Sequence, residues 1–212
     1  MTRTSGYVGT ALAFGLLVST PAFASVTPIE LTGWNQDLIA ENTAASPSAG
    51  TTSQAGGNWV YYEQGAPGTS QGLPLSGGFT SASNPNVVFQ LQNYTANNAA
   101  FQFDGTLALV TPGSYSSLSL LTSSQAIGSF AITFQFSDGS SYAVSGTDDD
   151  WTGAPASDAT VSLANVGVVQ RDSNWAGVYS GTLNLLEHDF TLPVADDSKT
   201  LDDLLVSTTG NE

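Results

Sequence analysis

The chain of 212 residues contains no cysteine, one histidine and only three lysine and arginine residues. Without cysteine there can be no disulfide bonds, no catalytic thiolate and no zinc site built on sulfur. The shortage of basic residues leaves a net charge of −15. A protein with so few cations cannot neutralise nucleic-acid phosphates or bind an anionic membrane surface. We therefore expect neither as a partner and attribute the acidity to solubility.

The single histidine, His188, limits nucleophilic catalysis in the same way. A Ser-His-Asp set would have to use it, and the one G-x-S-x-G match, "GTSQG" at 68–72, lies in a predicted loop rich in glycine and proline and not at the strand-to-helix turn that presents a nucleophilic serine. In "LLEHDFTL" the histidine alternates in phase with Leu186 and Phe190, whereas Glu187 and Asp189 fall on the opposite face of the predicted strand. The pattern favours a partly buried structural histidine.

Long apolar runs are missing except at the N-terminus, where "VGTALAFGLLVSTPAFA" follows Arg3. A basic start, a short apolar core and a small-x-small ending predict a signal peptide over residues 1–24, cleaved after Ala24. The run is short for a membrane span and contains Pro21, so we expect no insertion after cleavage. The rest, 25–212, is expected to form one secreted domain, extracellular or periplasmic, with a core that needs no disulfides.

This mature segment is rich in glycine and in short alternating apolar runs, which indicate strands joined by turns. We predict strands at "IELTG", "QDLIAE", Val87–Leu91, Ala99–Phe103, Thr106–Val110, Ser117–Thr122, Phe130–Phe136, Thr160–Ala164, Gly181–Leu192 and Leu201–Ser207. The last of these also fits a short helix at "TLDDLL". The fold class is therefore all-β, an antiparallel sandwich or jelly roll of roughly eight to eleven strands.

One hairpin can be assigned a register from the sequence "SFAITFQFSDGSSYAVSG". A two-residue loop at Asp138-Gly139 would place Tyr142 on the wrong face of the sheet. A three-residue loop, Ser137 to Gly139, instead pairs Phe134 with Tyr142 and keeps the apolar side chains together. We predict this loop, with Gly139 in the left-handed bulge position.

Several stretches resemble secreted bacterial proteins that often carry a C-terminal PEP-CTERM sorting tail. They are "PIELTGWNQDLIAEN", "GLPLSGGFTSASNPNVVFQLQNYTANNAAFQF", "TLALVTPGSYSSLSLL", "FSDGSSYAVSGTDDDW" and "LPVADDSKTLDDLLVS". The resemblance implies an exported, galactose-binding-like jelly roll of a kind that is also appended to extracellular glycoside-processing enzymes. The chain departs from these relatives in lacking the sorting tail and in carrying "GVVQR", with only Arg171 of two usual arginines.

The run "GTDDDWTG" places Asp148, Asp149 and Asp150 next to Trp151, at the start of the loop predicted to follow a strand that ends at about Gly146. Adjacent carboxylates repel one another unless donors or a cation intervene, and calcium takes oxygen ligands of this kind. The spacing differs from that of an EF-hand loop. Two alternatives follow: a structural calcium site at the three aspartates, or a solvated turn with Trp151 in the core.

Tryptophan beside amide and charged side chains indicates a sugar site, because indole stacks on sugar rings while polar groups bond to the hydroxyls. The candidate ligand-binding residues are Trp151, Arg171, Asn174 and Trp175. The leading hypothesis is a non-catalytic module that binds extracellular polysaccharide and needs no cofactor. The alternatives are a structural component of the envelope or biofilm matrix, and a glycoside hydrolase using two acids from among Asp148–Asp150, Glu63 and Glu187.

Overall fold

A computed structural model describes residues 28–41, 59–65, 71–170 and 178–209. Within these ranges the protein is all-β and has no helix, so no helix there is long and apolar enough to cross a bilayer. In chain order the strands are β1 (Leu31–Thr32), β2 (Ile39–Ala40), β3 (Trp59–Tyr62), β4 (Gly78–Thr80), β5 (Val88–Gln90), β6 (Asp104–Gly113), β7 (Ser117–Thr122), β8 (Gly128–Phe136), β9 (Ser141–Asp148), β10 (Thr160–Gln170), β11 (Val178–Thr191) and β12 (Leu201–Thr209).

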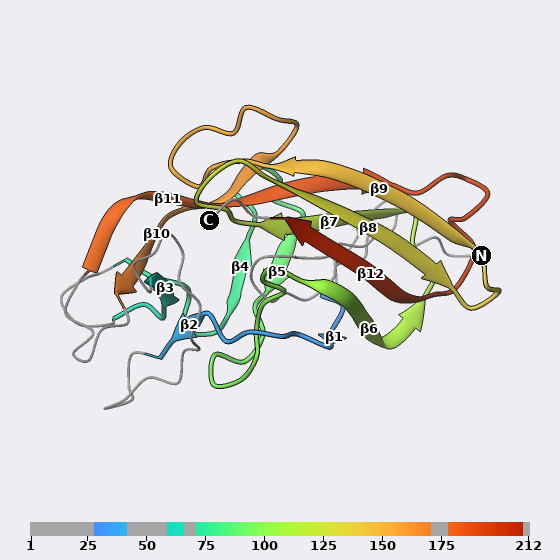
Figure 1. Ribbon diagram of the computed structural model, residues 1–212, viewed down its shortest axis with the longest axis horizontal. Coiled ribbons are helices and arrows are strands. Elements are labelled where there is room, and N and C mark those ends of the chain that lie inside the picture. The colour runs from blue at the N-terminus through green and yellow to red at the C-terminus, as the bar shows by residue number, and fades with distance from the viewer. Residues whose placement is uncertain (1–27, 42–58, 66–70, 171–177, 210–212) are drawn as a thin grey trace.

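The strands form two five-stranded sheets and a small hairpin. The first sheet has the order β1-β6-β12-β8-β9 and the second the order β2-β3-β10-β11-β7, while β4 pairs only with β5. Figure 1 shows β6, β12, β8 and β9 side by side, with β2 and β3 grouped at the other end of the molecule. The predicted all-β sandwich is confirmed. It has 12 described strands and one parallel pair, β2 with β3.

Two apolar clusters hold these layers together. One contains side chains of β6, β8 and β12 with Leu118 and Leu120 of β7. The other joins the second sheet to the β4-β5 hairpin and includes Leu121 of β7 with Leu183 and Leu185 of β11. Strands β7 and β11 are therefore covered on both faces. Polar side chains such as Ser119 and Glu187 are therefore buried on the second face, whereas Asp189 near the end of β11 is exposed.

The β8-β9 hairpin has the predicted register. Phe134 pairs with Tyr142 and Ile132 with Val144, and the two rings of the first pair stack with centroids 6.2 Å apart. Gly139 has a φ of +81°, the left-handed conformation expected of the bulge position. The prediction of a three-residue loop is confirmed.

The predicted strand at Ala99–Phe103 is wrong. Only its first residue pairs, in an isolated bridge with Gln36. The backbone N–H of Phe101 donates to the side chain of Asn35, and the Asn35 amide donates to the Phe101 carbonyl, each at 2.9 Å. An asparagine side chain thus takes the place of a neighbouring strand.

Two strands, β3 and β4, were not predicted. In β3 the run "WVYY" has no alternation, and β4 is a three-residue strand beginning at a glycine. The final segment, in contrast, is strand and not helix. It lies between β6 and β8 in the first sheet, where the ladders on both sides decide its conformation.

Candidate functional site

Trp151 belongs to the core. Its side chain is 4% exposed and packs edge-on against Tyr61, with ring centroids 5.6 Å apart. Its backbone accepts from the N–H of Asn184 and donates to the carbonyl of Ser124. The indole therefore offers no open face to a sugar ring, which corrects its assignment as a ligand platform. The other three candidate ligand residues, Arg171, Asn174 and Trp175, lie outside the described residues.

Asp148 is the last residue of β9, paired with Gly128, and not the start of a loop as predicted. Its Oδ1 atom is buried and has no hydrogen-bond partner among the described residues. Burial raises the pKa of Asp148 to about 7; the nearby Thr122 hydroxyl lowers it, and the charge of Asp149 raises it. Asp148 therefore holds a proton far more readily than an ordinary aspartate.

The next two aspartates have local donors. Burial raises the pKa of Asp149, but hydrogen bonds from Ser157 and from the Ala156 backbone outweigh it and leave that pKa below its usual value. Ser157 donates its backbone N–H to Oδ2 of Asp149 at 2.9 Å. Asp150 accepts from the backbone and hydroxyl of Thr152 at 2.7 and 2.5 Å. The described ranges hold no group of three or more His, Cys, Asp or Glu side chains placed to bind a metal.

The predicted burial of His188 is confirmed. Its side chain is 2% exposed and its ring packs edge-on against Phe130 at 4.9 Å and parallel to Phe190 at 6.5 Å. Burial lowers its pKa, although the negative charges of Asp158 and Asp149 act in the opposite direction. The imidazole is therefore neutral at pH 7 and lies among aromatic rings of the first cluster.

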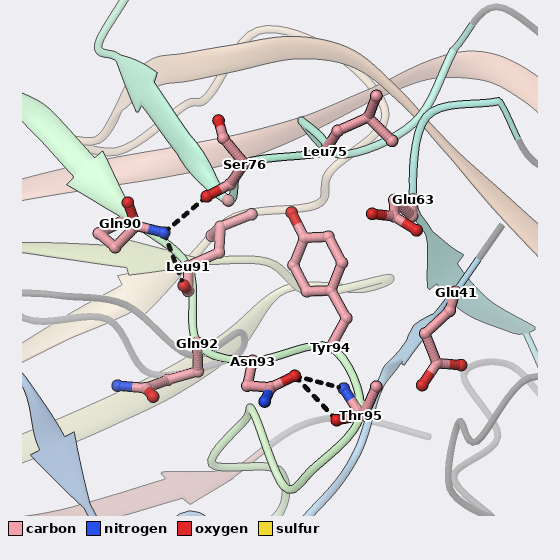
Figure 2. Close-up of a pocket in the computed structure, with 11 residues that line it drawn as sticks. Glu41, Glu63, Leu75, Ser76, Gln90, Leu91, Gln92, Asn93, Tyr94 and Thr95 are labelled. Carbon is pink, nitrogen blue, oxygen red and sulfur yellow. Dashed lines mark hydrogen bonds between the residues drawn. The ribbon is translucent and has the colours of Figure 1, made fainter. Parts of the chain in front are cut away.

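A polar pocket of about 340 Å³ lies beside the ends of β2, β3 and β5 (Figure 2). Its walls carry carboxylates, amides, hydroxyls and a few apolar side chains. They are Glu41, Glu63, Leu75, Ser76, Gly77, Gln90, Leu91, Gln92, Asn93, Tyr94 and Thr95. Its volume falls within the range of about 300–1,000 Å³ that is typical of small-molecule sites.

The parallel pairing of β2 with β3 places two acids side by side on one wall. Ala40 is opposite Tyr62, and the backbone N–H of Glu63 donates to the Ala40 carbonyl at 2.8 Å. Glu41 directly follows β2 and Glu63 directly follows β3, and Figure 2 shows both carboxylates on the same side of Tyr94. The two glutamates give this wall of the pocket a negative charge, which disfavours anionic ligands.

The opposite wall is a hydrogen-bonded loop after β5. Gln90 donates its amide to the carbonyls of Ser76 and Leu91 at 2.9 and 3.2 Å. Asn93 accepts from the backbone and the hydroxyl of Thr95, both at 2.9 Å. These bonds fix the loop, and with it the side chains that line the pocket.

Tyr94 forms the middle of the pocket in Figure 2. Its hydroxyl donates to the carbonyl of Pro74 at 2.6 Å, which connects the two loops that line the site. Burial, and next the charge of Glu63, raise the pKa of this tyrosine, so it stays protonated at neutral pH. Leu75, 63% exposed, adds an apolar side chain at the rim.

Of this pocket, sequence reasoning named only Glu63, as one of several acids that could serve in a pair. The signal that it missed is the position of Glu41 and Glu63, each directly after an apolar strand, in "LIAE" and "YYE". No protein-family model matches the chain, and no curated protein matches it significantly. The functional argument therefore depends on the pocket and its chemistry.

Proposed function

We propose that the protein is a secreted, non-catalytic carbohydrate-binding module with a galactose-binding-like jelly-roll fold, and that it binds saccharide in the pocket of Figure 2. The observation that carries the proposal is the lining of that pocket. Carboxylates on one wall face amide and hydroxyl groups on the other, with Leu75 and Tyr94 between them.

This lining matches the chemistry of a sugar. Each hydroxyl of a saccharide donates one hydrogen bond and accepts up to two; carboxylates accept such bonds, and amides both accept and donate them, with fixed direction. The C–H faces of the ring need apolar contact, which the exposed side chain of Leu75 at the rim can supply. The charge of the pocket also restricts the kind of saccharide that it can bind. Two glutamates and no basic residue line the pocket, so neutral saccharides fit and uronic or sulfated ones do not.

Binding is tested on an array of neutral and acidic glycans with the full chain. We expect binding to neutral saccharides that Glu63→Gln and Leu75→Ala weaken by about tenfold, equivalent to roughly 1.4 kcal/mol each. Two matched changes serve as controls. Glu30→Gln removes an exposed acid outside the pocket, and Ile127→Ala removes an apolar side chain that is 61% exposed, as Leu75 is 63% exposed.

Other results would overturn the proposal. A blank array, or binding that the pocket variants and the controls change alike, would exclude this site; self-association of the chain in the same samples would then favour the matrix role. Release of shorter saccharides, lost in Glu41→Gln or Glu63→Gln, would show that the two acids form a catalytic pair and that the module is an enzyme.

A further inference from the structure

A second polar site, separate from the saccharide pocket, lies on the face of β11 that is turned towards the β4-β5 hairpin. Glu187 is 1% exposed there, although charged side chains are rarely buried without a partner. Its Oε2 accepts hydrogen bonds from the hydroxyls of Ser81 and Ser83, the latter at 3.1 Å. Thr160 of β10 donates to Ser83 at 3.0 Å and extends this network. One oxygen of the carboxylate is thus well supplied with donors.

The other carboxylate oxygen of Glu187 has no such donors. Oε1 of Glu187 is buried and has no hydrogen-bond partner among the described residues. The hydroxyl of Ser119 on β7 is also buried, with the side chain 0% exposed, and is likewise without a described partner. Ser119 pairs in register with Asp189, which lies two residues from Glu187 on the same face. The register therefore places these three oxygen-bearing side chains on one face of the sheet, with Ser119 directly opposite Asp189.

No basic side chain in the described part of the chain neutralises these two acids. Lys199 pairs with Asp196 at 2.7 Å and with Asp138 at 3.7 Å. His188, between them in sequence, points to the opposite face and packs on Phe130. Burying a carboxylate without a cation is costly, so the buried Glu187 favours a positive charge from outside the chain.

We propose that Glu187, Asp189 and Ser119 bind a calcium ion. Asp189 is exposed, so the ion enters the site from the side of this residue and keeps part of its water there. The donor set is oxygen only, which selects a hard cation. Calcium accepts irregular geometry and six to eight ligands, whereas magnesium requires a regular octahedron that three side chains on two rigid strands do not provide. The site is distinct from the run Asp148–Asp150 and does not depend on saccharide binding.

The test is a calorimetric titration of the full chain, freed of metal with a chelator and desalted, with calcium chloride. We expect one saturable site and a rise in melting temperature with calcium. Asp189→Asn should weaken binding by about tenfold or more, and because this side chain is exposed the variant should fold. Glu187→Gln should abolish binding, with circular dichroism to verify its fold. Asp202→Asn, an acid on β12, is the matched control and should bind as the parent does.

Three results would overturn the inference. They are the absence of saturable calcium binding, binding that Asp189→Asn leaves unchanged, and binding of magnesium chloride as tight as that of calcium. Loss of calcium binding in Asp150→Asn, with Asp189→Asn unaffected, would also overturn it and would place the ion at the acidic run.

Discussion

Asp148 carries a buried carboxyl whose ionisation affects the stability of the fold. Its pKa rises from the ordinary 3.8 to about 7 because its carboxyl is buried. A raised pKa means that the folded state binds the proton more tightly than the unfolded state does. The stabilisation that comes from this tighter proton binding is therefore complete below about pH 4 and is lost as the pH rises through about 7. Near neutral pH the ionised carboxyl destabilises the fold by on the order of 3 kcal/mol.

This reasoning predicts a pH-dependent gain from Asp148→Asn. The amide keeps the shape of the neutral carboxyl, so the variant should match the parent at pH 4 and exceed its free energy of unfolding by on the order of 3 kcal/mol at pH 8. Urea unfolding of both chains across this pH range measures the difference. A constant difference between them, or a loss at pH 8, would show that folding does not raise the pKa of this carboxyl.

Trp151 offers a second prediction at this scale. Because the indole is buried against Tyr61, Trp151→Ala should lower the free energy of unfolding by about 3–5 kcal/mol. Trp151→Phe should cost less because it keeps an aromatic ring there. Denaturant unfolding gives both values. A near-neutral Trp151→Ala would mean that the indole faces solvent, as a sugar platform requires.

Among the elements, the β8-β9 hairpin was predictable because one local rule fixes it. Its apolar residues must share a face, and only one loop length brings them together with glycine at the left-handed position. Ala99–Phe103 has the same kind of pattern, yet its backbone bonds to Asn35 from a distant segment. Sequence patterns identify apolar residues well, but do not show whether a strand or a side chain supplies the hydrogen bonds.

The loop of this hairpin can be tested directly. Gly139 has a positive φ and no atom within 4 Å of where a Cβ would lie, so substitution meets conformational strain and not a clash. We expect Gly139→Val to lower the free energy of unfolding by about 1–2 kcal/mol and Gly139→Asn by less, since asparagine tolerates this conformation. Chemical denaturation with an unchanged m-value measures this. Equal effects of the two variants would contradict the left-handed assignment.

Strand β11 shows why the buried polar residues escaped sequence reasoning. Its alternation correctly placed His188 on one face and Glu187 on the other. An alternating pattern indicates one buried face, whereas here the β4-β5 hairpin covers the second face as well. The hairpin that covers this face lies about a hundred positions away in the sequence. The local alternation of apolar and polar residues in β11 therefore cannot indicate that the face is covered.

On the scale of the whole molecule, the polar pocket of Figure 2 is produced by topology. The parallel pairing of β2 with β3 aligns Glu41 and Glu63, and the loop after β5 closes the other side. An acidic all-β chain could be predicted from the sequence, and Glu63 was one of several acids considered for a catalytic pair. The partners of that glutamate depend on which strands become neighbours, and this could not be predicted from periodicity or composition.

The net charge of −15 predicts how the stability of the whole molecule depends on salt. Mutual repulsion of the acids opposes the compact state, and salt screens it over about 10 Å at 0.1 M. Raising potassium chloride from about 20 to about 200 mM should increase the melting temperature by a few degrees. Asp202→Asn combined with Glu30→Gln should reduce this dependence. A melting temperature that falls with salt would show that attractive ion pairs dominate.

The most direct test of the central claim is the affinity of the full chain for neutral saccharides before and after Glu63→Gln. The pocket account predicts binding to neutral glucans, galactans, xylans or mannans on an array, about tenfold weaker in Glu63→Gln and unchanged in Glu30→Gln. Binding that Glu63→Gln and Leu75→Ala leave intact, or no binding at all, would contradict the account.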